Sequence, residues 1–151
     1  MTNSGYKNDM NINEKVMMAT VRVAELFKKE ESSYLRKYDI TFSQYNILRV
    51  LDASENGQNT MKNVQKIMLV SRANMTGITK RLEKLGYIIR KNAPEDERLK
   101  YLELTPKGKD VVRRIALNKE EVLDKYLTNY PEEKKIELLN VFRQILRKKP
   151  A

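Results

Sequence analysis

The sequence predicts a mainly α-helical chain of the α+β class, with about six helices and one β-hairpin. Apolar residues recur at spacings of three and four through most of the 151 residues, which is the period of an amphipathic helix. Residues that favour helix ends and turns separate these stretches. Over residues 87–104 the pattern changes to the β-branched and aromatic residues typical of paired strands. A length of 151 residues suits a single domain.

The first helix is expected within residues 10–38. Its apolar residues begin at Ile12, continue through Val23 and reach Leu35 at helical spacing. The polar residues before it, 1–9, are expected to fray, because no apolar side chain ties this end of the chain to a core.

A second helix is expected from Thr41 to about Ser54. Thr41 and Gln44 have the spacing of a capping box, in which each side chain bonds to a free backbone N–H group at the start of the helix. The polar residues 55–59 are expected to form a loop.

Two further helices follow, with a short turn between them. Thr60 is expected to cap a short helix whose inward residues are Val64, Ile67 and Met68. Ser71 is expected to cap the next helix, which ends at Gly86 because glycine adopts the left-handed backbone that closes helices. A helix, a short turn and a second capped helix are together a helix-turn-helix.

A β-hairpin is expected directly after this motif. Residues 87–90 and 99–104 are the predicted strands, joined by a turn-rich tip. Alternation along the second strand places Leu102 and Leu104 inward. A hairpin in this place is a wing, so residues 41–104 are predicted to form a winged helix-turn-helix core with a two-stranded wing.

Two helices are expected after the wing. Thr105 can cap the first of them and Pro106 suits its first helical position. The last helix begins at Pro131, and its expected inward residues are Ile136, Leu139, Phe142, Ile145 and Leu146.

These flanking helices carry apolar stripes that the winged core cannot cover. Packing residues 10–38 and 105–148 against a second copy across a two-fold axis would bury those stripes, and a two-fold dimer is the commonest oligomer. We therefore predict N- and C-terminal dimerisation helices. A monomer that packs its own terminal helices together is the alternative.

The composition excludes several classes of function. The chain has no Cys, which excludes disulfides, thiolate metal sites and thiol catalysis, and no His, the commonest general base and metal ligand. No apolar run exceeds four residues, and no signal peptide is visible. We expect a cytoplasmic protein with no membrane segment, no cofactor, no metal site and no enzymatic activity.

The charge is unevenly distributed along the chain. The formal net charge is +10. Residues 1–60 hold 8 basic and 8 acidic residues, whereas residues 61–109 hold 12 basic and 5 acidic, a net charge of +7. The excess coincides with the predicted motif and wing, which favours a polyanionic partner such as DNA. A solvated basic surface that keeps the protein soluble is the alternative.

The helix after Ser71 is predicted to present two different faces. Its core face holds Met75, Ile78, Leu82 and Leu85. The opposite arc holds Arg72, Ala73, Thr76, Gly77, Lys80 and Lys84. Small residues let a helix approach a groove closely, arginine pairs with guanine, and alanine or threonine contacts the thymine methyl group. Asn74 and Arg81 flank this arc within reach of phosphates. A single residue such as Thr76 or Lys84 is more often an ordinary exposed polar position, but the arc taken as a whole favours contact with DNA.

Three motifs together resemble the MarR (multiple antibiotic resistance regulator) family. Ser71-Arg72-Ala73-Asn74-Met75-Thr76, with Arg81-Leu82-Glu83-Lys84-Leu85-Gly86-Tyr87-Ile88, resembles its recognition helix and following strand. Pro94-Glu95-Asp96-Glu97-Arg98, with Leu104-Thr105-Pro106-Lys107-Gly108, resembles its wing and next helix. Thr41-Phe42-Ser43-Gln44-Tyr45-Asn46-Ile47-Leu48 resembles its second helix. The resemblance covers about residues 12–147.

The resemblance implies a homodimeric transcription regulator, most often a repressor, that binds an inverted-repeat operator. It also implies that Arg98 enters the minor groove while Asp96 braces it, although Glu95 and Glu97 make this wing tip more acidic than the family pattern. The expected DNA-binding residues are Ser71, Arg72, Ala73, Asn74, Thr76, Gly77, Lys80, Arg81, Lys84, Arg90, Asp96, Arg98 and Lys100.

A small-molecule effector is a further implication of the resemblance. Many members of the family are released from DNA by phenolic or aromatic acids, and the candidate ligand residues here are Arg22, Tyr34, Tyr38 and Tyr45. A tyrosine in a helical stripe is more often a core residue. The alternative function is a winged-helix module that binds protein or RNA without operator specificity, which a weak salt dependence on duplex DNA would indicate.

Overall fold

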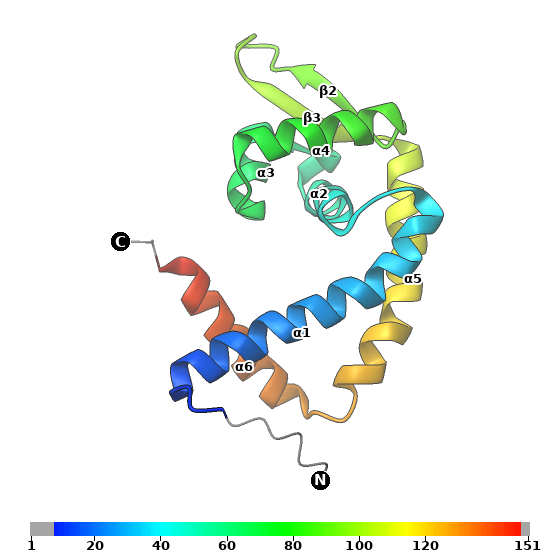
Figure 1. Cartoon of the computed structure of the whole chain (residues 1–151). Helices are drawn as coiled ribbons and strands as arrows, with labels where there is room; N and C mark the ends of the chain where they lie inside the picture. Colours follow the sequence, from blue (N-terminus) through cyan, green and yellow to red (C-terminus); the bar gives the residue numbers. More distant parts are fainter. Residues whose placement is uncertain (1–7, 149–151) are drawn as a thin grey trace. The chain divides into compact units, whose positions relative to one another are not determined.

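The computed structural model describes residues 8–148 (Figure 1). Contacts within the chain define two compact parts, one that ends at Ile115 and one that begins at Ala116. Most of the N-terminal segment that was expected to fray lies outside the described residues. None of the helices in the described part of the chain combines the length and the apolarity that a bilayer crossing requires.

The first part contains the predicted helices in the predicted order. They are α1 (Ile12–Leu35), α2 (Phe42–Asp52), α3 (Met61–Met68), α4 (Arg72–Lys84) and the first half of α5 (Pro106–Leu127). Two 3-10 turns that were not predicted lie between them, η1 (Arg36–Tyr38) and η2 (Glu55–Gly57), the second in the segment expected to be a loop. The capping box is present, because the Gln44 backbone N–H donates to Thr41 Oγ1 at 3.2 Å and the Thr41 N–H donates to Gln44 Oε1 at 2.9 Å. Thr60, Ser71 and Thr105 accept equivalent bonds at 3.0–3.2 Å.

The sheet has one strand more than the predicted hairpin. Strand β1 (Gln58–Thr60) pairs with β3 (Lys100–Leu104), which pairs on its other side with β2 (Ile88–Asn92), and both pairings are antiparallel. The prediction of a plain loop over residues 55–59 was therefore wrong at its end. Three polar residues carry no alternating pattern, and β1 forms because Asn59 meets Leu102 across the sheet.

The core of this part lies under α4 and the sheet. Its fully buried side chains include Leu35, Tyr45, Ile47, Leu48, Leu51, Val64, Met75, Leu82, Ile88, Leu102 and Val112. Leu102 is buried as predicted, and Leu104 packs against the core while partly exposed. Ile67 was predicted to face inward, and that was wrong, since its side chain is 58% exposed. The short helix α3 packs through Met61, Val64 and Met68, which leaves Ile67 on its outer side.

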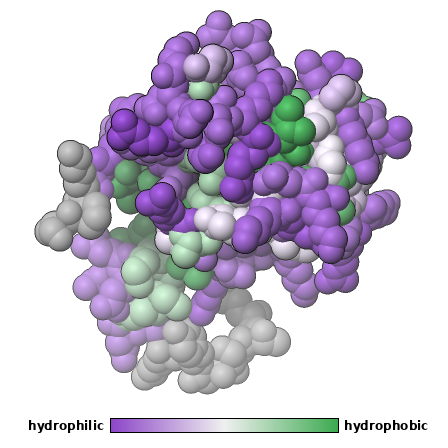
Figure 2. All heavy atoms as spheres, turned by 90° about the horizontal axis from the view of Figure 1, so that it is seen from above, coloured by the Kyte–Doolittle hydropathy of each residue, from purple (hydrophilic) through white to green (hydrophobic). Residues whose placement is uncertain are grey.

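The second part contains the rest of α5 and helix α6 (Glu132–Arg147). Helix α6 begins after Pro131 as predicted, but none of its residues is buried. Its predicted inward residues are between 36% (Phe142) and 65% (Leu146) exposed. These side chains are therefore not buried within a single chain, which agrees with apolar stripes that the winged core was not expected to cover. In Figure 2 most of the visible surface is hydrophilic and apolar residues form separate patches.

Candidate nucleic-acid interface

Helix α4 presents the two faces that its sequence predicts. Ser71 caps it by accepting the Asn74 backbone N–H at 3.2 Å. Met75 and Leu82 are buried, and Ile78 and Leu85 pack against the core. The opposite arc is exposed at every predicted position: Arg72, Ala73, Thr76, Gly77, Lys80 and Lys84. Asn74 is exposed as well. The helix therefore offers a cationic face made partly of small residues.

The two helical glycines of this part have opposite surroundings. A Cβ atom added to Gly77 would meet no atom within 4 Å, so packing within the chain does not require glycine there. A Cβ atom added to Gly108, in α5, would collide with the backbone oxygen of Tyr87. The close approach of the Tyr87 backbone therefore requires glycine at position 108. At position 77 no neighbouring atom requires glycine, and its effect is to leave the outer surface of α4 without a side chain.

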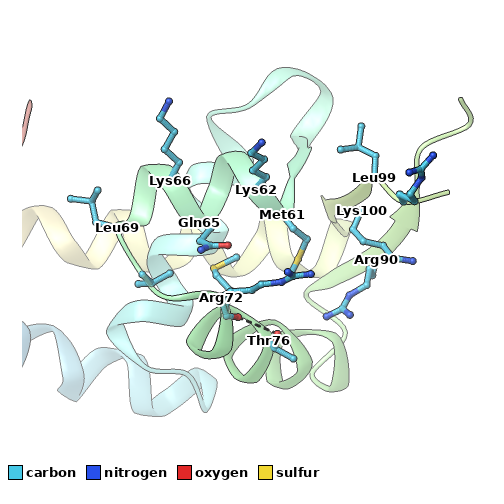
Figure 3. A pocket seen from close by; sticks show the side chains of 13 residues that line it. Met61, Lys62, Gln65, Lys66, Leu69, Arg72, Thr76, Arg90, Leu99 and Lys100 are labelled. Atoms are coloured by element: carbon cyan, nitrogen blue, oxygen red, sulfur yellow. Dashed lines mark hydrogen bonds between the residues drawn. The ribbon is translucent and has the colours of Figure 1, made fainter. Parts of the chain in front are cut away.

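A groove opens between α3, the start of α4 and the wing (Figure 3). Its volume is about 940 Å³. In Figure 3 Lys62 and Lys66 come from α3, Arg72 and Thr76 from α4, and Arg90 and Lys100 from the strands. The cationic lining residues are Lys62, Lys66, Arg72, Arg90, Arg98 and Lys100, and none of the thirteen lining residues is acidic. Such a groove concentrates positive potential and attracts a phosphate backbone.

Two of these cations were missed by the sequence analysis. Lys62 and Lys66 are four residues apart on α3 and lie opposite Val64, which is fully buried. Projecting α3 as a helix, in the way that predicted the faces of α4, would have placed both lysines on its outer side.

At the wing tip Arg98 lies beside an acidic residue, Asp96. The Arg98 backbone N–H donates to Asp96 Oδ1 at 2.9 Å, and the Arg98 Nε atom lies 3.7 Å from the same oxygen. The Arg98 side chain is 96% exposed. Beside it, Lys100 Nζ donates to Asn92 Oδ1 at 2.6 Å across the hairpin. Arg98 therefore projects into solvent from the tip, while Asp96 bonds to its backbone and lies near its side chain.

Two further predicted cations, on α4 and β2, are bonded within the chain. Arg81 forms an ion pair with Asp39, at the corner between η1 and α2. Arg90 Nη2 donates to Thr79 Oγ1 at 3.0 Å and lies 3.1 Å from Glu83 Oε1. Thr79 was left out of the predicted core face of α4, yet it is fully buried.

The corner beneath α4 is held by further bonds to backbone oxygens. The Tyr87 hydroxyl donates to the Tyr38 carbonyl at 3.1 Å, and Lys107 Nζ donates to the Leu85 carbonyl at 2.9 Å. Burial, together with the negative charge of Asp39 and the neighbouring Tyr38, raises the pKa of Tyr87. The end of α4 and the residues that follow it are thus joined to η1, to Asp39 and to the start of α5.

The four candidate ligand residues do not share a surface with the groove. Tyr45 is 1% exposed, and burial raises the pKa of its hydroxyl. Tyr34 lies under Lys37 Nζ, which is 6.0 Å from the ring centroid. Tyr38 is half-buried and Arg22 is exposed on α1. Within residues 8–148 no cluster of three or more acidic residues is placed to hold a metal ion.

Comparison with known proteins identifies the family. Residues 27–115 match the family model described as transcriptional regulator SarA/Rot, which spans more than half of the chain. The chain belongs to the SarA/Rot family. This SarA/Rot member is 30% identical over 114 residues to the HTH-type transcriptional regulator PapX of Escherichia coli, covering 76% of this chain and 70% of PapX. It is a DNA-binding transcriptional regulator, as its family and this relative are.

Solved structures share the fold of this SarA/Rot protein. Sco3205, a MarR family transcriptional regulator from Streptomyces coelicolor solved in complex with DNA, has a TM-score of 0.81 at 22% identity and covers 93% of this chain and 89% of its own. NadR, solved in complex with 4-hydroxyphenylacetate, has a TM-score of 0.78 at 22% identity and covers 95% of this chain and 99% of its own. The expected winged helix-turn-helix fold of the MarR type is confirmed.

Proposed function

We propose that this SarA/Rot protein is a homodimeric repressor that binds an inverted-repeat operator through α4 and the wing. The observation that carries the proposal is the groove without acidic residues, which adjoins the exposed small-residue face of α4. In this arrangement α4 enters the major groove and Arg98 enters the adjacent minor groove, whose negative potential attracts arginine. The phosphate strand between them passes over the groove.

The proposed DNA contacts divide by chemistry. Arg72, Thr76 and Lys80 lie on the exposed face of α4 and are assigned to base edges, while Ala73 and Gly77 let the helix backbone approach them. The phosphate contacts are assigned to Ser71, Asn74, Lys84, Lys100 and the two lysines of α3, Lys62 and Lys66. Arg81 already forms an ion pair with Asp39. To contact a phosphate, its guanidinium would have to bond to the phosphate and to the Asp39 carboxylate at the same time.

The dimer is proposed on the exposed apolar residues of the flanking helices. In α1 these include Ile12, Val16 and Val21, each more than half exposed, and in α6 they include Ile136 and Leu139. Residues 10–38 and 105–148 are assigned to dimerisation and residues 41–104 to DNA binding. A two-fold dimer would place two copies of α4 about 34 Å apart, one DNA turn, which is the spacing expected of an inverted repeat.

A small-molecule effector is the third part of the proposal. NadR is solved with 4-hydroxyphenylacetate, and a small aromatic acid of that kind is the proposed ligand class here. Of the four candidate residues, Tyr34, Tyr38 and Arg22 have exposed atoms in the single chain. A ligand that binds the released form of the dimer better than the DNA-bound form would lower DNA affinity. The proposal includes no catalytic activity and places the protein in the cytoplasm with the DNA.

The test is selection of duplexes from a random-sequence pool, followed by fluorescence-anisotropy titration at two salt concentrations. The expected result is an enriched inverted repeat, weaker binding by Arg98→Ala and Lys80→Ala, and a steep salt dependence, about 0.9 in log–log slope for each phosphate contact. Weak binding with no enriched sequence, equal in all three proteins, would instead support a module that binds protein or RNA.

A further inference from the structure

We propose that Thr79 and Arg90 form a strut that holds the wing at a fixed distance from helix α4, and that Arg90 is a positioning residue. The inference rests on the proposed function, because it concerns how α4 and the wing contact one duplex together. The strut is defined as the hydrogen bond from Arg90 in β2 to the hydroxyl of Thr79 in α4, with Glu83 beside it.

Thr79 is a polar residue whose side chain is buried in the core. It is 0% exposed, between the buried residues Met75 and Leu82 on the same face of α4. Its hydroxyl lies 2.8 Å from the Met75 carbonyl and 3.2 Å from the Thr76 carbonyl, so its proton is bonded inside the helix. Valine has nearly the same shape and would fill this site without a polar atom to satisfy. Among the described residues, the hydroxyl has one hydrogen-bond partner outside α4, the guanidinium of Arg90, from which it accepts.

The guanidinium of Arg90 is held from two successive turns of α4. Its Nη2 atom lies 3.0 Å from Thr79 Oγ1 and 3.1 Å from Glu83 Oε1, which is four residues further along the helix. The Arg90 side chain is 31% exposed and the Glu83 side chain 36% exposed, so both are partly sheltered from solvent. Charge-assisted bonds in such a site are stronger and more directional than those between neutral groups. Arg90 therefore connects the strand to α4 in one orientation.

The wing needs such a connection because its DNA-facing residue is remote from the core. Arg98 is at the free end of the hairpin and its side chain is 96% exposed. Strand β2 is an edge strand that pairs only with β3 in this sheet. A small change in the tilt of the hairpin therefore moves Arg98 relative to α4. Fixing this tilt before binding reduces the conformational freedom lost on binding, which raises affinity for a site that needs both contacts.

The variant Thr79→Val tests the strut without changing any charge. We expect it to weaken binding about tenfold on a fluorescein-labelled duplex selected by the wild-type protein. The salt slope should stay the same, because no phosphate contact is removed. Thr79→Ser keeps the accepting hydroxyl and should restore most of the affinity. Circular dichroism melting of each variant checks that the fold is intact, and Arg90→Gln provides a second variant that removes the donor instead of the acceptor.

A double-mutant cycle with Arg98→Ala separates positioning from general stability. If the strut acts by placing Arg98, Thr79→Val should have little further effect once Arg98 is gone, because its contact no longer exists to be placed. Additive losses would overturn the proposal, since they would mean that Thr79 only supports α4. Unchanged affinity in Thr79→Val, with a lower salt slope in Arg90→Gln, would also overturn it and make Arg90 a direct phosphate ligand.

The failure of the proposed function gives a different result from the failure of the strut. If the wild-type protein selects no duplex, the proposed function fails. The strut is then tested by hydrogen exchange. The backbone amides of β2 and β3 should exchange faster in Thr79→Val than in Thr79→Ser. Equal exchange in the two variants would overturn the strut even without DNA.

Discussion

Helices α4 and α6 are both amphipathic, but their apolar faces have opposite fates in the chain. Helix α4 buries Met75 and Leu82 under the sheet and turns a cationic face outward. Helix α6 buries none of its residues, and Leu139 and Phe142 remain 45% and 36% exposed. An apolar period therefore predicts an amphipathic helix without showing whether the same chain covers its apolar face.

This difference also separates the two proposed tasks. Because the apolar face of α4 is part of the core of its own chain, the outward face is free to contact DNA. Because the apolar face of α6 has no cover within the described residues, it is the face that a second copy would bury. Substitutions in the two helices should consequently fail in different ways, and each prediction below tests one side of the comparison.

The largest effect is expected for Leu82→Ala in α4. Leu82 is 0% exposed, and removing a buried leucine side chain costs about 2–5 kcal/mol of stability through lost contacts and a residual cavity. Urea unfolding followed by circular dichroism should show this loss at every protein concentration. Phe142→Ala in α6 is the comparison: it should lower the midpoint only at concentrations where the protein is dimeric, because only there does the interface contribute to stability. If both variants lost the same stability at every protein concentration, the apolar face of α6 would be buried within its own chain, as that of α4 is.

A charge in the apolar face of α6 should have the next largest effect. Leu139→Glu places a carboxylate where the second copy would bury it, which should convert the dimer to a monomer and weaken operator binding by at least about a hundredfold. Light scattering and anisotropy measure the two effects. Gln144→Glu is the matched control, because it introduces the same charge on the polar side of α6 and should leave the dimer intact. A dimeric Leu139→Glu protein would place the interface elsewhere.

Much of the fold was predictable because its determinants are local. The capping box of Thr41 and Gln44, the cap at Ser71 and the closing Gly86 each act within about four residues, so the sequence displays them directly. Strand β1 was missed because its polar residues pair only when β3 is brought to them. Its cause lies more than forty residues away along the chain.

The candidate site was predictable in part for a similar reason. The exposed arc of α4 followed from one helical projection, which needs only the residue spacing. The projection grouped apolar residues, so it overlooked the polar but buried Thr79. The groove could not be predicted, because Lys62 and Arg98 line it together only through the placement of α3 beside the wing.

A smaller effect is expected for Arg98→Ala at the wing tip. Its exposed side chain contributes nothing to the core, so thermal stability should be unchanged. Operator affinity should fall by about 1–3 kcal/mol, the range for a specific arginine contact, with a reduced preference at the base pairs nearest the wing. Glu97→Gln, which changes charge at the neighbouring tip residue, should raise affinity slightly by reducing phosphate repulsion. Unchanged binding by Arg98→Ala would remove the wing from the interface.

The smallest and most discriminating effect is expected for Gly77→Ala. A methyl group at position 77 meets nothing within 4 Å, and alanine is favoured over glycine by about 0.8–1.0 kcal/mol in a helix interior. The unfolding free energy should therefore rise. The same methyl group would stand between the α4 backbone and the floor of the major groove, so operator affinity should fall several-fold.

These opposite signs make Gly77→Ala a sharp test of which face of α4 meets DNA. Ala73→Gly is the matched reverse change on the same exposed arc, and it should lower stability by a similar amount without adding any obstacle to DNA. Both quantities can be measured on the same samples, by thermal unfolding and by anisotropy. If Gly77→Ala stabilises the protein and leaves affinity unchanged, the open surface at position 77 is not in contact with DNA, and the contact must lie nearer to Arg72 and the groove.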